Sequence, residues 1–188
     1  MNTGRFPFLG QRTRSGPTAD HLDIGTAYVA LRFGLIAGDW WGQSNTVAGT
    51  KRRPGSEGRR ACAKHVAIVT AAQAASLGLA CVVTGRRLDL SRVVTGLAVN
   101  GASHFWADRR TGWETFIKEY LGKAEFYEKG KLKSEEYGTD CLATGAHMLD
   151  RTWHDAWNIA AAVYLAGLRA GRGGRIHAEY APDTGRYE

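Results

Sequence analysis

Two pairs of histidine and aspartate stand four residues apart in otherwise apolar stretches of this 188-residue chain. His104 and Asp108 lie in the segment NGASHFWADRR, and Asp150 and His154 lie in LDRTWHDAW. In a helix, residues i and i+4 share one face, so each pair can direct both side chains toward one point. Imidazole and carboxylate groups are common ligands of divalent metals. The spacing therefore predicts that both pairs contribute to one polar site.

Two further segments place polar groups in apolar surroundings. Asp39 lies beside Trp40 and Trp41 and is followed four residues later by Gln43, and His65 opens the most apolar run of the chain. Inward-facing His and carboxylate side chains are a known way to build a metal site in a helical bundle. Zinc, manganese, iron and nickel all suit such donors. We predict a site for one or two divalent ions with the ligands Asp39, His65, His104, Asp108, Asp150 and His154.

A structural role is the alternative for each of these residues. Asp150 can cap the last helix, and Asp108 can pair with Arg109 or Arg110 at a helix end. Cys62 could join His65 in binding zinc, but a small core residue is the simpler interpretation. As a set, the residues favour a shared polar site, because burying several charges without partners is very costly.

A metal-dependent hydrolase is the function that these donors favour. A bound divalent ion lowers the pKa of water and generates hydroxide. The net charge of +7, from 25 Lys and Arg against 18 Asp and Glu, suits a phosphoester or phosphoanhydride substrate. Asp108 and Asp150 are the candidate catalytic residues. The candidate substrate-binding residues are Lys51, Arg109, Arg110, Lys123, Gln43 and Trp153.

Four long helices must position these side chains. We predict the first from the N-cap Asp23 to about residue 43, the second over about 60–83 with a stop at Gly85, the third from Asp89 or Ser91 to about 109, and the last from about 145 or 149 to 168. We expect a loop at 44–59, and at 111–148 a short helix over 112–121 followed by an irregular loop. The predicted fold class is all-α, a compact four-helix bundle.

The chain length fits one domain. We expect a flexible basic arm at 1–20, a single helical domain at 21–170 and a polar tail at 171–188. The three cysteines form no CxxC pair, which favours a reduced compartment over a secreted disulfide framework.

Residues 65–85 form a run of 21 residues without Asp, Glu, Lys or Arg, which is long enough to cross a membrane. The run is nevertheless rich in Ala and contains Thr70 and Gln73. Basic residues flank the apolar runs without an inside–outside asymmetry. We therefore predict a cytoplasmic protein, with a small integral membrane protein as the alternative.

A non-catalytic binding module is the second functional hypothesis. The basic segment that contains Arg52, Arg53, Arg59 and Arg60 is typical of an anion-binding loop, and equally of a solvated one. Nucleic acid or a host protein would be its partner, bound through salt-dependent contacts. The sequence does not indicate the oligomeric state.

The chain resembles an uncharacterised family of actinobacterial and actinophage helical proteins over about residues 25–168. That family is similar in turn to a broader group with membrane-like hydropathy. The shared pieces are Asp39-x3-Gln43, Lys51, Cys62-x2-His65-Val66, His104-Phe105-Trp106-Ala107-Asp108-Arg109-Arg110, Leu121-Gly122-Lys123, Phe126-Tyr127, Thr144-Gly145-Ala146 and Leu149-Asp150-x2-Trp153-His154. Similar proteins usually have His at the position of Leu35. The resemblance implies a reduced or altered site here, and it supports the site rather than a reaction.

Overall fold

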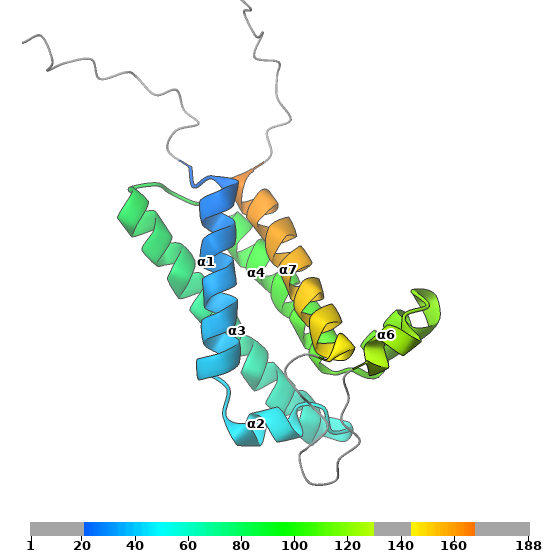
Figure 1. Ribbon diagram of the computed structural model, residues 1–188. Coiled ribbons are helices and arrows are strands. Elements are labelled where there is room, and N and C mark those ends of the chain that lie inside the picture. The colour runs from blue at the N-terminus through cyan, green and yellow to red at the C-terminus, as the bar shows by residue number, and fades with distance from the viewer. Residues whose placement is uncertain (1–20, 130–143, 168–188) are drawn as a thin grey trace, which may run out of the picture.

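The computed structural model describes residues 21–129 and 144–167, and helices dominate both ranges (Figure 1). Apart from one isolated bridge between His21 and Arg87, these residues form no β-structure. The predicted all-α class is therefore confirmed. The elements are α1 (Ile24–Ile36), η1 (Ala37–Trp41), α2 (Asn45–Thr50), α3 (Gly55–Thr84), α4 (Leu90–Asp108), α5 (Thr111–Thr115), η2 (Phe116–Tyr120), α6 (Ala124–Glu128) and α7 (Gly145–Ala166), of which η1 and η2 are π-helical.

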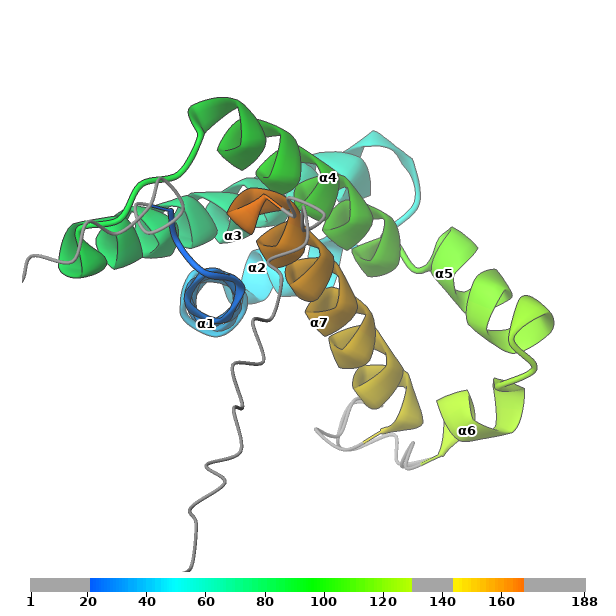
Figure 2. The ribbon, with the colours of Figure 1, turned by 90° about the horizontal axis from the view of Figure 1, so that it is seen from above.

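Four long helices form the body of the molecule. α1 packs against α3 and α7, and α4 packs against the same two helices, so the four helices close into a ring. The view from above shows α1 end-on while α3 lies across it (Figure 2). The compact four-helix bundle stays a prediction, because these helices splay.

The ends of the long helices follow the signals in the sequence. Asp23 caps α1, and its carboxylate accepts a hydrogen bond from the backbone N–H of Thr26 at 2.9 Å. Gly85 ends α3 with a φ of 66°, a left-handed conformation that glycine adopts without strain. Asp89 caps α4 in the same way as Asp23 caps α1. These three boundaries agree with the prediction.

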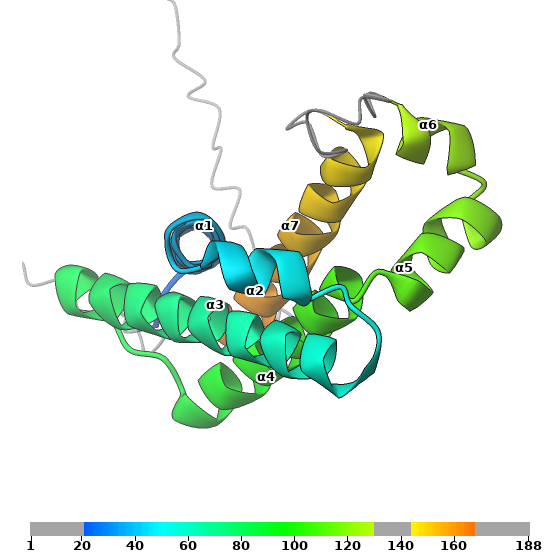
Figure 3. The same ribbon diagram turned by 90° about the horizontal axis from the view of Figure 1, so that it is seen from below.

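Two predicted loops contain helices. Within 44–59, the Ser44 hydroxyl caps α2, and α3 begins at Gly55, directly after the N-cap Pro54. Within 111–148, α5 and η2 form the predicted short helix, but α6 follows, and α7 begins at Gly145. The view from below shows α5 and α6 projecting beyond α4 and α7 (Figure 3). The predicted tails at 1–20 and 171–188, and residues 130–143, lie outside the described residues.

Three glycines let the chain of α1 and η1 approach α3 closely. A Cβ atom on Gly34 would lie 2.5 Å from the Cα of Gln73, and one on Gly38 would lie 2.6 Å from the Cα of Val69. Gly42 meets the side chain of Ile68 in the same way. Because α3 backbone occupies these positions, no larger residue fits at Gly34 or Gly38 without moving a helix.

Among residues 21–129 and 144–167, one helix is long and apolar enough to cross a membrane. This is α3, yet only 17% of its most apolar 18-residue window is buried within the structure. Length and composition alone do not place it in a membrane, because core helices of soluble proteins share them.

Candidate metal centre

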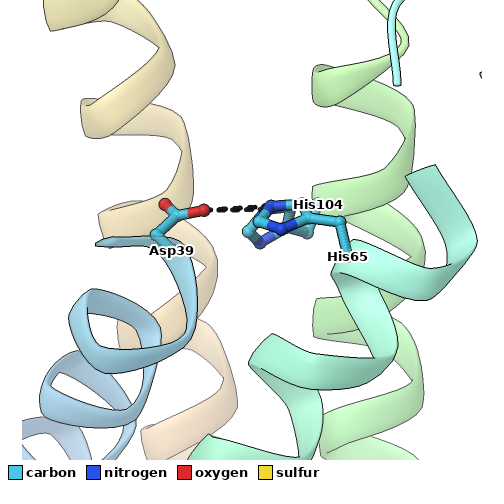
Figure 4. A group of neighbouring side chains, drawn as sticks. All are labelled: Asp39, His65 and His104. Carbon is cyan, nitrogen blue, oxygen red and sulfur yellow. Dashed lines mark hydrogen bonds and ion pairs between the residues drawn. The ribbon is translucent and has the colours of Figure 1, made fainter. Parts of the chain in front are cut away.

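Four elements bring polar side chains together at the lower end of the ring. Asp39 comes from η1, His65 from α3 and His104 from α4, and Figure 4 shows the Asp39 carboxylate pointing at the two imidazoles. His154 from α7 joins them, because its ring lies 4.1 Å from that of His104 between centroids. His65, His104 and His154 are all buried. Four of the predicted ligands therefore meet in space.

The donor atoms have the spacing of a coordination shell. His65 Nε2 lies 3.0 Å from Asp39 Oδ1 and 3.2 Å from His104 Nε2, and His104 Nε2 lies 3.8 Å from Asp39 Oδ1. Nitrogen and oxygen ligands at about 2.0–2.1 Å from a tetrahedral zinc ion lie about 3.3 Å from one another. The Asp39–His65–His104 triad fits this geometry.

Asp108 adds a second carboxylate to the same point. Its Oδ2 lies 3.1 Å from His65 Nε2 and 3.3 Å from His104 Nε2. His65 Nε2 thus faces three polar atoms, although an imidazole nitrogen carries at most one hydrogen to donate. A cation at the centre would satisfy all of them together. The donor atoms of Asp108, His104 and His154 also lie within 4.8 Å of one another.

A π-helical turn carries Asp39. The α1 helix widens into η1 at Ala37–Trp41, and the backbone N–H of Gly42 bonds to the carbonyl of Ala37, five residues earlier. Such turns are rare in proteins overall, and those that occur are often found at functional sites. The Asp39 side chain is 26% exposed, so it is the solvent-facing member of the cluster.

Lys51 lies inside the cluster. Its ammonium donates hydrogen bonds to Asp108 Oδ2 at 2.9 Å and to Gln43 Oε1 at 3.2 Å, and only 7% of the residue is exposed. Burial alone would raise the pKa of Asp108, but hydrogen bonds from His104 and His65 and the charge of Lys51 hold it well below its ordinary value. Burial likewise acts to raise the pKa of Asp39, which the hydrogen bond from His65 and the charge of His104 lower. Both carboxylates are therefore ionised at neutral pH.

A small cleft between α1 and α7 leads to the cluster. Asp39, Asp150 and His154 line it together with Arg32, His147 and Arg151. Asp150 Oδ1 is buried and has no hydrogen-bond partner, and it lies 3.8 Å from His154 Nε2. The predicted Asp150–His154 pair thus faces a route from solvent. Leu35 lines the same cleft.

Apart from Lys51 and Gln43, the predicted substrate-binding residues lie outside the cluster. Arg109 donates to the backbone carbonyls of Lys51 and Arg53, and it thereby fixes the segment before α3. Arg110 donates to the Tyr127 hydroxyl and forms an ion pair with Asp150 Oδ2 at 3.8 Å, and Lys123 is exposed.

Trp153 and Cys62, which the sequence offered as candidates for substrate and zinc binding, both lie among packed side chains. Trp153 belongs to an aromatic cluster with Trp106, Trp113 and Phe116. Cys62 is buried, its thiol donates to the carbonyl of Phe105 at 3.7 Å, and burial raises the pKa of Cys62 to about 11. This environment suits the interpretation of Cys62 as a core residue.

A second polar layer lies above the cluster and was not predicted. The Gln73 amide donates to Asn158 Oδ1 at 2.9 Å and to the Leu31 carbonyl at 3.2 Å, and the Asn100 amide donates to both Gln73 Oε1 and Asn158 Oδ1 at 3.1 Å. Each of the three lies one or two helical turns from a cluster histidine. That helical spacing is the sequence signal that could have identified them.

Comparisons of the chain with models of protein families, with curated proteins and with solved structures find no match. The function of the cluster is therefore interpreted from its own geometry.

Proposed function

We propose that this protein is a metal-dependent hydrolase that acts on a phosphoester or phosphoanhydride. The observation that carries the proposal is the convergence of Asp39, His65 and His104 from three elements, with donor atoms 3.0–3.8 Å apart. A divalent ion held there would lower the pKa of a bound water and supply hydroxide at neutral pH. Zinc, manganese, iron and nickel all fit the His and Asp donors.

The residues around the triad have distinct roles in this proposal. His154 and Asp108 complete the ligand set, and Lys51 holds Asp108 in its buried position. The Lys51 ammonium also adds a fixed positive charge that would stabilise negative charge on a phosphoryl group. Asp39 faces the cleft and leaves one side of the triad open to water and substrate.

Asp150 is the candidate general base. Its unpartnered Oδ1 lies beside the cleft, where it could accept a proton from the attacking water. Asp108 is the weaker candidate, because its Oδ2 already contacts Lys51, His65 and His104. At the mouth of the cleft, Arg151 is exposed and could bind the anionic substrate.

The first test is the metal content of untagged protein by elemental mass spectrometry, before and after reconstitution. We expect a near-stoichiometric divalent ion in the wild type, its loss in His104→Ala, and its retention in the matched control His21→Ala, since His21 is exposed and outside the cluster. A wild-type chain that binds no divalent ion even after reconstitution would overturn the proposal.

The second test separates catalysis from metal binding. Asp150→Asn should keep the ion and lower the turnover of an aryl phosphate ester by about 100-fold or more, the range for loss of a general base. Asp89→Asn is the control, because asparagine caps a helix as well as aspartate does. Equal turnover in Asp150→Asn and wild type would exclude Asp150 as the base.

A non-catalytic nucleic-acid-binding module is the second candidate. Arg59, Arg60 and Lys64 are exposed on the first turns of α3 and form a positively charged edge. In this case, charge reversal at Arg59 and Arg60 would weaken binding to duplex DNA, and salt would weaken it in the wild type. Unchanged DNA binding in the charge-reversed chain would exclude this candidate.

A further inference from the structure

The interior of the helical body is an apolar core that includes Leu31, Leu77 and Leu97, and it also holds three polar amides. Gln73, Asn100 and Asn158 are buried at the centre of the four helices. In contrast, Val82 of α3 is 80% exposed and Leu90 of α4 is 76% exposed. Apolar surface of this extent on a protein marks an interaction site, usually with another protein or a membrane.

The exposed apolar surface extends around the four helices. Large apolar side chains that are about half exposed or more occur on every one of them: Val29 and Phe33 on α1, Leu79, Val82 and Val83 on α3, Leu90, Val94 and Val99 on α4, and Ile159 and Tyr164 on α7. A second copy of the chain or a docked helix would cover one side of such a surface. Only a continuous apolar medium such as lipid, which surrounds the whole body, would cover all of it.

The length of the uncharged stretch fits a bilayer. Residues 65–85 of α3 and its cap contain 21 residues without a charged side chain, which at 1.5 Å per residue span about 31 Å. The hydrocarbon core of a bilayer is about 30 Å thick. Arg59, Arg60 and Lys64 precede the stretch, and Arg86 and Arg87 follow it. Basic side chains at the ends of an embedded helix extend to the membrane–water interface, where their charges stay in water.

The embedded parts of the other helices contain three charged side chains, and each has a partner: Arg92, near the start of α4, donates to the Tyr164 carbonyl of α7. Arg32, in the middle of α1, forms an ion pair with Asp155 of α7. Charged groups at membrane depth normally pair with one another in this way. Trp40 and Trp41 follow α1 and are 60% and 78% exposed, at the end of the body where the basic residues of α3 begin. Exposed tryptophans are enriched at membrane–water interfaces.

We propose that this protein is embedded in a lipid bilayer through its four long helices. Residues 65–85 cross the hydrocarbon core, and the shorter segments 24–36, 90–104 and 154–166, about 20–23 Å long, lie in it beside them. Asp39, Lys51, Asp108 and Asp150 then lie at one boundary of the hydrocarbon layer, beside the basic start of α3. The cleft at Asp39 opens at this boundary, so water and a polar substrate reach it from the aqueous side.

The first test is extraction of membranes from cells that express the full chain. We expect the protein in the membrane fraction, retained after washing with alkaline carbonate and released by detergent. Release by carbonate would show a peripheral protein and overturn the proposal. A chain recovered without detergent in the soluble fraction would overturn it too, and a soluble dimer would assign the apolar surface to a second copy.

The second test locates the lipid on the surface. Leu79→Cys and Lys64→Cys are compared, because Leu79 and Lys64 are both exposed in the structure. The background chain carries Cys81→Ser and Cys141→Ser, so that neither of these cysteines reacts. In open membrane fragments, a water-soluble maleimide should label Lys64→Cys about tenfold or more faster than Leu79→Cys, since the hydrocarbon core contains no water. Equal rates would contradict embedding. Neither readout depends on metal content, so the result is independent of the proposed hydrolase function.

Discussion

Lys51 is the residue whose placement most changes the interpretation of the site. The sequence predicted it as a substrate-binding cation, and the structure places its ammonium against Asp108 and Gln43, away from solvent. Within the cluster it acts as a fixed counter-charge for a buried carboxylate. Its role toward a substrate stays a prediction.

Replacing Lys51 with Met should destabilise the protein. The substitution leaves Asp108 buried with one cationic partner fewer, a change that costs about 3 kcal/mol for a buried ion pair. The measurement is the free energy of unfolding by chemical denaturation.

Arg53→Met is the control for Lys51→Met. Arg53 pairs with Glu57 at the surface, and an exposed pair contributes at most about 1 kcal/mol. A loss of stability no larger in Lys51→Met than in Arg53→Met would contradict the buried ion pair.

The sequence identified the cluster residues better than it identified their partners. His65 and His104 stand out because each interrupts an apolar run. Lys51 does not, because a lysine in a basic segment is usually solvated. Gln73, Asn100 and Asn158 carry no charge, so only their helical spacing from the cluster histidines sets them apart from exposed amides. Only the packing of four helices brings them together.

At the scale of elements, the glycines of α1 and η1 set the distance between Asp39 and His65. Gly34, Gly38 and Gly42 recur every four residues, and Gly34 and Gly38 lie against the backbone of α3. The absence of side chains there lets the two segments meet. The sequence shows this spacing, but not which helix it faces.

Gly38→Ala should move η1 away from α3. The added methyl group would lie 2.6 Å from Val69 Cα, and overpacking of this kind costs about 1–3 kcal/mol. We also expect weaker metal binding, because Asp39 would move with the backbone. Denaturation and a metal titration measure the two effects.

Gly78→Ala provides the matched control in a helix. No atom lies within 4 Å of the added methyl group, so we expect unchanged metal affinity and a gain of about 0.5–1 kcal/mol. If Gly38→Ala behaved in the same way, the close approach of η1 to α3 would be unnecessary for the site.

Helix ends were predictable where a capping residue stands next to an apolar run, as at Asp23, Gly85 and Asp89. The expected loop at 44–59 was wrong because Pro54 and Gly55 suggested a turn. They form the start of α3 instead, and the short α2 precedes them. A six-residue helix has too few residues for a recognisable period.

At the scale of the whole molecule, metal binding should be coupled to folding. The ligands come from η1, α3, α4 and α7, so only the folded chain brings them together. At a free metal concentration about 100 times the Kd, the ion should stabilise the protein by about 2.7 kcal/mol. Thermal unfolding with metal and with chelator measures this shift.

His104→Ala should abolish the thermal shift, and His21→Ala should preserve it. An identical shift in His104→Ala and wild type would mean that the ion binds elsewhere on the chain.

The choice between cytoplasm and membrane also belongs to this scale. The sequence contains an uncharged run of 21 residues but no asymmetry of basic loops, and these two signals point in opposite directions. What the sequence does not show is which side of each helix faces outward. The packing shows that much of α3 faces outward with its apolar side chains.

The π-helical turn at Ala37–Trp41 makes the site sensitive to chain length as well as to residue type. Its hydrogen bonds enclose one residue more than those of an α-helix. Deleting a single residue between Ile36 and Asp39 would restore α-helical bonding and move Asp39 to the position of Gly38, which lies against the α3 backbone at Val69. Asp39 would then leave the cluster, although every ligand residue would still be present in the chain. A single-codon deletion in this turn would therefore remove the site without replacing any of its ligands.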